Sequence, residues 1–344
     1  MLSSTILTTL EDVRALAPQW NALGPLTPFS SWDFAYDWLF CTPEARPFVI
    51  AVHDQEQLVG IAPWCLARDY AGSMVLTGIG RESSWYHDPL VHPAADAAEV
   101  HLTICQALRP RRWDAIDLIL QANESLPLVR NLEQLGLAVS RRPSDRQSRL
   151  YELDPGGQAF WEGFSASSRK SMRRRLRQLE AVPHEFRLAQ GAQAMEYLEE
   201  LIQLNRERWQ TGENWEPTYA FMRANTPTLL AQGDLRFFVL TIEGRTAALD
   251  YQVRKGSRSF AIMASVHPEF ADHSPGSLLL NWAIGELARE GIRTLDLGPG
   301  EYEWKKRLQS GLVETVRTQV GSSLLGMALV GWRSMIKPRL LTAT

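Results

Sequence analysis

The sequence predicts an α/β (α+β) protein built from two tandem copies of one fold, each a mixed, mostly antiparallel sheet flanked by helices. Helical and strand-like segments follow a similar order in the two halves of the 344-residue chain. In the first half, His92-Pro93 precedes a long helical segment, and Asp117-Leu118 lies on the strand after it. In the second half, His267-Pro268 and Asp296-Leu297 hold the same places. Internal duplication is the simplest explanation.

The second half gives the element order most clearly. A strand and two helices come first, then three strand-like runs joined by tight turns, a long helix, a short buried strand, a short helix and a last strand. Their ranges are 185–189, 192–209, 216–231, 235–242, 245–254, 258–265, 274–290, 294–297, 301–309 and 312–320. Glu243-Gly244 is a good hairpin turn, and Gly291 supplies the left-handed residue that ends the long helix.

The first half repeats this order less regularly. Its expected strands and helices occupy 5–8, 10–23, 32–40, 47–53, 57–67, 73–79, 95–108, 115–120, 125–135, 137–140 and 149–153. The boundary between the copies is expected within 155–164. The predicted domains are therefore residues 1–155, a degenerate copy, and residues 156–322, with a packed terminal helix or tail at 323–344.

Composition excludes several classes of protein. The formal net charge is −3 and the pI is about 6.2, so the chain as a whole does not attract nucleic acid or anionic lipid. Cys41, Cys65 and Cys105 lie far apart without CxxC spacing, which indicates neither a disulfide framework nor a zinc site. We expect no metal, no signal peptide, no membrane span and a cytoplasmic location.

One helix start carries the main functional prediction. Ser274-Pro275-Gly276-Ser277 opens the long helix of the second half. The unpaired amides of a helix N-terminus favour an anion such as a pyrophosphate, and glycine lets phosphate oxygens approach the backbone. An ordinary serine-capped helix is the alternative. The matching helix of the first half begins Pro93–Ala97, with Asp96 and no glycine, so we expect no cofactor there.

The order of elements in the second half resembles that of the GNAT fold. His267–Leu279 and Asp296–Arg307 are similar to the C-terminal half of the CelD-type acetyltransferases, tandem GNAT proteins related to the Fem peptidyltransferases. That family shows Ser-Pro-Gly at the helix start, Asp-Phe-x-x-Gly after the next strand, and Tyr-Lys further on. Here Asp296-Leu297 and Gly300 follow, and Trp304-Lys305 stands in place of Tyr-Lys. The resemblance is specific over about residues 244–307.

The resemblance implies transfer of an acyl group, expected to be acetyl, from coenzyme A to an amine. A backbone N–H on the fourth strand would polarise the thioester carbonyl and strengthen its hydrogen bond in the transition state. The implied cofactor-binding residues are Ala264, Ser265, Val266, Ser274, Pro275, Gly276, Ser277 and Leu278.

Catalytic groups are sought among polar residues on the buried strands. Asp296 ends one strand, where it serves either as a general base or as a cap of the Gly298–Gly300 turn. Asp250 interrupts an apolar run and is a second base candidate. Tyr302 is a candidate proton donor to the departing thiolate. Lys305 matches the family's lysine and would hold an anionic group of the acceptor, or else face solvent.

Two further segments suggest contacts with substrates. Trp85, Tyr86 and Asp88 belong to an aromatic-polar cluster that we expect to bind the acceptor, with Asp88 attracting a cationic amine. The run Arg169–Arg177 forms one strongly basic helix face in an acidic protein. The face is either an ordinary solvated helix face or a site for a phosphate-rich partner: the 3′-phosphate of coenzyme A, a nucleotide-linked acceptor or RNA.

Three functions follow from these observations. The first is an acyl-coenzyme-A-dependent N-acyltransferase acting on a sugar or small-metabolite amine, linked to exopolysaccharide or cell-envelope biosynthesis. The second is an aminoacyl-tRNA-dependent, Fem-like peptidyltransferase. The third is a non-catalytic binding protein with the GNAT fold.

Overall fold

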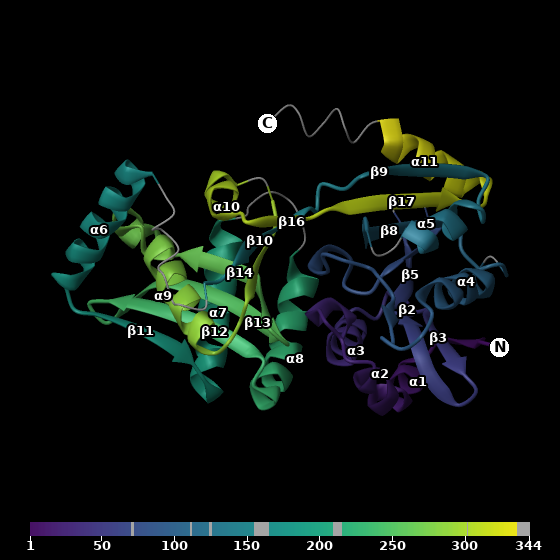
Figure 1. Ribbon diagram of the computed structural model, residues 1–344, viewed down its shortest axis with the longest axis horizontal. Coiled ribbons are helices and arrows are strands. Elements are labelled where there is room, and N and C mark those ends of the chain that lie inside the picture. Colours follow the sequence, from purple (N-terminus) through teal and green to yellow (C-terminus); the bar gives the residue numbers. More distant parts are fainter. Residues whose placement is uncertain are drawn as a thin grey trace. The chain divides into compact units, whose positions relative to one another are not determined.

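The computed structural model describes residues 1–69, 72–110, 112–123, 126–154, 165–208, 215–300 and 302–335. They fold into two compact units (Figure 1). Unit 1 contains residues 1–147 and 313–344, and unit 2 contains residues 148–312. The segment 155–164, expected to join the two copies, lies outside the described residues.

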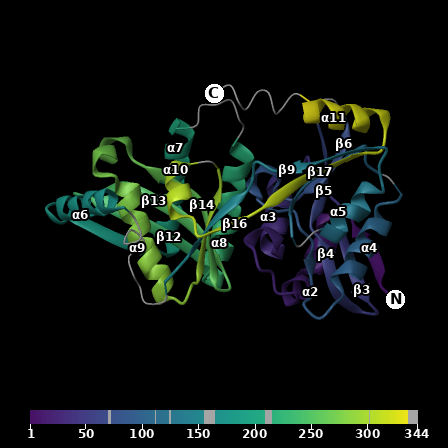
Figure 2. The ribbon, with the colours of Figure 1, turned by 45° about the horizontal axis from the view of Figure 1, so that its top comes forward.

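Each half of the sequence supplies one strand to the unit that the other half mainly forms. Strand β10 (Ser148–Glu152) pairs with β15 (Thr294–Pro299) in unit 2. Strand β17 (Thr315–Gly321) lies between β8 (Ala115–Gln121) and β9 (Ala138–Pro143) in unit 1. Figure 1 shows it there in yellow, and Figure 2 shows it beside β9. The units therefore divide near 147 and 312, whereas boundaries at 155 and 322 were expected, because each terminal strand takes its hydrogen-bonding partners from the other copy.

Unit 2 is a mixed sheet with helices on both faces. The sheet order is β11-β12-β13-β14-β15-β10-β16. Its strands besides β10 and β15 are β11 (His184–Ala189), β12 (Leu235–Ile242), β13 (Arg245–Lys255), β14 (Arg258–Val266) and β16 (Gly311–Val313). Its helices are α6 (Ala166–Glu180), α7 (Gly191–Arg208), α8 (Glu216–Gln232), α9 (Pro275–Arg289) and α10 (Glu303–Leu308), with a short 3-10 segment, η4 (Pro268–His273).

Alternation along β12 distributes those helices between the two faces. Phe238 packs edge-on against Trp282 of α9, and the next residue back, Phe237, packs against Tyr197 of α7. Successive side chains of a strand point to opposite faces, so α9 covers one face and α7 covers the other. The α9 face also takes Met172 and Leu179 of α6 into its apolar core.

Unit 1 divides its strands between two sheets. One has the order β1-β3-β4-β7 and the other β2-β5-β6-β8-β17-β9. The strands not yet placed are β1 (Ser3–Leu7), β2 (Arg46–Pro47), β3 (Val49–Asp54), β4 (Gln57–Ala62), β5 (Trp64–Arg68), β6 (Met74–Gly78) and β7 (Leu90–Val91). The expected strand 57–67 is broken at Pro63, because proline has no N–H to donate to the ladder.

Helices cover the strands of unit 1. They are α1 (Leu10–Ala15), α2 (Ala17–Ala22), α3 (Trp32–Cys41), α4 (Ala97–Ala107), α5 (Leu126–Glu133) and α11 (Leu324–Met335). The expected terminal helix corresponds to α11, which packs on β17 and β9. A Cβ at Gly326 would lie 1.8 Å from the Asp114 carbonyl oxygen, so only glycine permits this approach. No helix in the described part of the chain is long and apolar enough to cross a membrane.

Candidate active site

The two parallel strands of unit 2 diverge after a short paired stretch. Their register joins Arg258–Phe260 of β14 to Thr294–Asp296 of β15, and β14 then continues to Val266. A bulge at Ile262 interrupts the pairing of β14 with β13, since Tyr251 faces Met263 and Gln252 faces Ala261. Bulges bend strands and increase their twist, which helps β14 to leave β15.

The divergence leaves backbone donors of β14 directed away from β13. His267 N–H donates to the Ala247 carbonyl oxygen at 3.0 Å, so in the alternating antiparallel pattern Ala264 and Val266 point their N–H groups to the opposite edge. Both residues are exposed. This edge therefore offers amide donors on the side where β15 has separated.

The start of α9 lies beside the end of β14. A Cβ placed on Gly276 would lie 3.9 Å from Val266 Cγ2. Ser274 has left-handed backbone angles (φ 53°, ψ 47°), and its hydroxyl does not cap the helix. The Ser274 carbonyl accepts from the N–H groups of Ser277 and Leu278. Gly276 is exposed and Pro275 buried, so in the described part of the chain the Gly276 amide is left open at the helix start.

Asp250 is a buried carboxyl with one unsatisfied oxygen. Its side chain belongs to β13, in register with Phe238 on one side and Ala264 on the other. Oδ2 accepts from Gln252 Nε2 at 2.7 Å, whereas Oδ1 has no hydrogen-bond partner among the described residues. Burial raises the pKa of Asp250 to about 6, and the Gln252 hydrogen bond opposes this shift. Such a carboxyl is suited to accept a proton near neutral pH.

Asp296 has a fuller set of partners. It is completely buried. Oδ1 accepts from the Gly298 N–H at 3.0 Å and from the Ser148 hydroxyl, and Oδ2 accepts from Arg258 at 2.7 Å. The Gly298 hydrogen bond is the turn cap that was the alternative to a general base. These contacts favour a structural role that ties β10, β14 and the Gly298 turn together.

Lys305 is buried rather than facing solvent. Its Nζ donates to the carbonyl oxygens of Gly298 at 3.2 Å and Pro299 at 2.8 Å, and it lies 5.4 Å from the ring centroid of Tyr302. Burial lowers the pKa of Lys305 to about 8. Tyr302 is 40% exposed and precedes α10. Lys305 therefore holds the turn at the end of β15 through two hydrogen bonds, and the Tyr302 ring lies beside its ammonium group.

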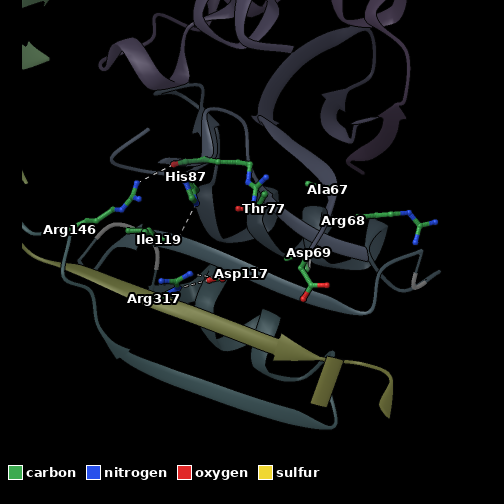
Figure 3. A pocket seen from close by; sticks show the side chains of 11 residues that line it. Ala67, Arg68, Asp69, Thr77, His87, Asp117, Ile119, Arg146 and Arg317 are labelled. Carbon is green, nitrogen blue, oxygen red and sulfur yellow. Dashed lines mark hydrogen bonds and ion pairs between the residues drawn. The ribbon is translucent and has the colours of Figure 1, made fainter. Parts of the chain in front are cut away.

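Unit 1 has the same pair of diverging parallel strands, but there His87 lies between them and binds Ile119 of β8. Thr77 of β6 and Asp117 of β8 end the paired stretch. Beyond it, His87 donates its backbone N–H to the Ile119 carbonyl at 2.8 Å and accepts the Ile119 N–H on Nδ1 at 3.1 Å (Figure 3). Its ring packs so closely on Gly78 that a Cβ there would lie 2.2 Å away. Asp96 caps α4 by accepting from the Ala98 N–H.

The expected acceptor residues of unit 1 are held by their own neighbours. Trp85 and Tyr86 are buried and pack around Phe29. Asp88 accepts from the Gln121 backbone N–H at 3.0 Å. These contacts fix the cluster within unit 1.

The basic run forms most of α6. Ser165 caps the helix by accepting from the Ser168 N–H, and the buried residues Met172 and Leu179 face the core. Lys170, Arg173, Arg174 and Arg177 are exposed. Helix α6 contacts η4, the segment that leads into Ser274.

Several residues of this region were not anticipated. Arg258 and Ser148 bind Asp296, and Gln252 bridges Asp250 to the Ser259 hydroxyl at 2.8 Å. Gln252 lies two residues after Asp250, and residues at this spacing in a strand share a face. This spacing is the signal that could have identified Gln252. No local signal identifies Ser148, because the exchange of β10 brings it to Asp296. Among the described residues there is no cluster suited to a metal ion.

Comparisons with known proteins identify a domain family that part of the chain matches. Residues 166–306 match the family model described as acetyltransferase (GNAT) domain. No curated protein matches the sequence.

Several solved structures share the fold across nearly the whole chain. A FemX crystal structure aligns with a TM-score of 0.61 and 11% identity, over 97% of this chain and 99% of that one. The C-terminal domain of a putative lysylphosphatidylglycerol synthetase from Agrobacterium fabrum aligns at 0.58 with 12% identity, over 95% and 98%. A tandem GNAT protein from the clavulanic acid biosynthesis pathway aligns at 0.54 with 15% identity, over 94% and 100%.

These likenesses confirm the predicted tandem GNAT fold, with helices flanking mixed sheets; in unit 1 the strands are divided between two sheets, of which one is mixed. The family match lies within the copy that keeps an open divergence and an uncapped helix start. The chain therefore has the tandem GNAT fold, and its residues 166–306 match a GNAT acetyltransferase domain, which supports an acyltransferase.

Proposed function

We propose that unit 2 transfers an acyl group, acetyl in the first instance, from coenzyme A to an amine of a sugar or small metabolite. The observation that carries the proposal is the juxtaposition of the open α9 start at Gly276 with the end of β14 at Val266. A diphosphate needs backbone amides at a helix N-terminus, and a pantetheine arm needs a strand edge with unpaired groups. Both features lie side by side.

The acyl donor would be held by backbone groups. The Gly276 amide would bind the diphosphate, and the outward N–H groups of Ala264 and Val266 would bind the arm and the thioester carbonyl. An N–H aimed at the carbonyl oxygen gains strength as that oxygen becomes negative, which lowers the barrier. The glycine matters because a side chain at this position would occupy the space that the diphosphate needs.

Asp250 is the proposed general base. It lies opposite Ala264 in the ladder, and its Oδ1 is unsatisfied among the residues described. It would take a proton from the attacking amine as the C–N bond forms and the C–S bond breaks, and the thiolate would be reprotonated, with Tyr302 as the proposed donor. We propose that Asp296 and Lys305 position the turn after β15.

The proposed acceptor is an amine-bearing sugar or small metabolite. The resemblance to CelD-type proteins favours an amine-bearing precursor of an exopolysaccharide or of the cell envelope. Trp85, Tyr86 and Asp88 remain the predicted acceptor-side residues of unit 1, although each has partners of its own there.

The proposal is tested by a pair of matched substitutions in α9. Gly276→Asp adds a carboxylate where the diphosphate is proposed, and the surrounding protein leaves room for its Cβ, the nearest atom being 3.9 Å away. Gly285→Asp makes the same change further along the same helix, where the nearest atom is the end of Arg289 at 3.6 Å. We expect Gly276→Asp to weaken acetyl-coenzyme A binding by calorimetry at least tenfold, and Gly285→Asp to leave it within about twofold.

Equal affinity in the two variants would overturn the proposed site, provided that their thermal unfolding matches the parent. A second function, aminoacyl-tRNA-dependent peptidyl transfer, is favoured by the exposed basic residues of α6. Binding of bulk tRNA but not acetyl-coenzyme A would support it. Binding of neither would favour a non-catalytic role.

A further inference from the structure

Unit 1 contains a polar pocket of its own, whereas the proposed donor site belongs to unit 2. It has a volume of about 70 Å³ and opens on one face of the sheet, over β5, β6, β8 and β17. Its lining includes Thr77, Asp117 and Ile119 from the floor strands, together with His87 (Figure 3). Thr77 and Asp117 are the last paired residues of the parallel strands, so the pocket begins where those strands diverge.

His87 presents an unsatisfied donor to this pocket. Its Nδ1 accepts the Ile119 N–H at 3.1 Å, so in the neutral ring the proton is on Nε2. Nε2 is buried and has no hydrogen-bond partner among the described residues, and the whole residue is only 5% exposed. A buried N–H without an acceptor costs roughly the desolvation of a polar group. The Arg81 carbonyl lies near the ring but makes no hydrogen bond to Nε2, so an acceptor from outside the chain can complete the site.

The charges that line the pocket are mainly positive. Among the described residues, the pocket is lined by four arginines and two aspartates: Arg68, Arg81, Arg146, Arg317, Asp69 and Asp117. Arg317 binds Asp117 through two 2.7 Å hydrogen bonds. Those bonds neutralise Asp117 and still leave an excess of positive charge around the His87 donor. Asp145 also lies close enough to Arg317 to favour its charged form.

The loop that carries the donor is held in an unusual conformation. Arg146 Nη1 donates to the carbonyl oxygens of Arg81 at 3.1 Å and Ser84 at 2.9 Å. Arg81 has a left-handed φ of 41°, which a non-glycine residue adopts at a cost unless its surroundings enforce it. This strained residue lines the pocket and is exposed at its own position. The loop therefore keeps Arg81 at the rim while His87 remains inside.

We propose that this pocket binds a small oxyanion, a phosphate or carboxylate group, which accepts the His87 Nε2–H and lies among the arginines that line it. Arginine and an N–H donor match the oxygen acceptors of both groups. A cation is disfavoured, because the inward group of His87 is a donor and arginines outnumber carboxylates in the described lining of the pocket. Burial lowers the pKa of His87 to about 4, with Arg317 adding to the effect and Asp117 and the Arg81 carbonyl opposing it. The ring is therefore a neutral donor at pH 7.

The test uses the full chain and two substitutions in the pocket. His87→Asn keeps an acceptor for the Ile119 N–H and removes the Nε2 donor. Arg81→Gln removes a rim charge from an exposed residue, so it tests the pocket even if His87→Asn fails to fold. Arg14→Gln is the matched control, because Arg14 is an exposed residue of α1 that does not line the pocket.

Calorimetric titrations with inorganic phosphate and with succinate, at constant ionic strength, measure the binding. We expect the parent to bind at least one of them, and the two arms distinguish phosphate from carboxylate. His87→Asn should weaken binding roughly tenfold or more, Arg81→Gln should weaken it severalfold, and Arg14→Gln should not change it. In nitrogen-15 spectra of the imidazoles, the ligand should shift the Nε2 signal of His87. The proposal is overturned if the parent binds neither anion, or if all three variants bind as the parent does.

Discussion

At the scale of single residues, two buried aspartates of one sheet have opposite surroundings. Asp296 is completed by an arginine, a serine and a backbone amide. Among the described residues, Asp250 has one amide partner and one oxygen without a hydrogen-bond partner, and burial raises its pKa to about 6. Environments that separate two carboxyl groups in this way are typical of sites where one is structural and the other transfers protons. The sequence alone left both open as bases.

Asp250→Asn tests this separation. If Asp250 is the base, the rate should fall by about 10²–10⁴-fold. The parent's kcat/KM should rise with pH through about 6, as the carboxyl loses its proton, and that rise should disappear in the variant. Asp272→Asn, at an exposed residue of η4, is the control. A parent-like pH profile in Asp250→Asn would remove Asp250 from the mechanism.

The same raised pKa predicts a change in folding stability. A carboxyl that is harder to ionise when folded stabilises the protein fully below its unfolded pKa, and this contribution is lost as pH rises through about 6. The free energy of unfolding of Asp250→Asn, measured by chemical denaturation at several pH values, should therefore decline less between pH 4 and 7 than that of the parent.

At the scale of elements, equivalent helices differ in their first turns. Helix α4 is capped by its own Asp96, and α9 begins with an uncapped Ser274 and an exposed Gly276. Each carries the positive end of a helix dipole, but in α4 a carboxylate already occupies it. The residue at the helix start thus separates the proposed anion-binding helix α9 from α4, whose start is capped by its own side chain. The sequence indicated this difference, since both starts are local patterns.

The exposed basic face of α6 gives a prediction at the same scale. Because α6 contacts η4, which leads into α9, we expect Lys170 and Arg174 to interact with the 3′-phosphate of coenzyme A. The parent should bind acetyl-coenzyme A severalfold more tightly than its 3′-dephospho form, as one or two exposed charge pairs permit. Lys170→Gln combined with Arg174→Gln should abolish that preference in calorimetry. If the double variant still prefers acetyl-coenzyme A to its 3′-dephospho form, the basic face does not bind the 3′-phosphate, and RNA is the partner to test next.

At the scale of the whole molecule, the exchange of strands couples the two halves of the chain. Strand β17 comes from the end of the sequence and pairs with both β8 and β9. Strand β10 comes from the end of the first half and carries Ser148 to Asp296. Each sheet therefore depends on residues from the other half of the sequence. Neither half, cut at the expected boundary near 155, would contain its complete sheet.

A fragment ending at Leu312 tests this dependence. It lacks β17, α11 and the last residue of β16, so β8 and β9 lose their shared ladder partner. We expect hydrogen exchange to become fast in β8 and β9 while β12 and β13 stay protected. A fragment ending at residue 335 is the control, because it keeps every element that the structure describes. Unchanged protection of β8 and β9 in the shorter fragment would contradict the assigned pairing.

The sequence by itself determined the duplicated element order, the α/β class and the position of the open helix start at Ser274–Ser277. Apolar spacing, turn residues and capping residues act over a few neighbouring positions, so a single segment carries them. Only the tertiary structure decided which copy each terminal strand joins, how Asp250 and Asp296 differ, and that Lys305 is buried. Alternation along a strand tells which side chains face inward but not which strand lies beside it, and desolvation depends on every segment packed around a group.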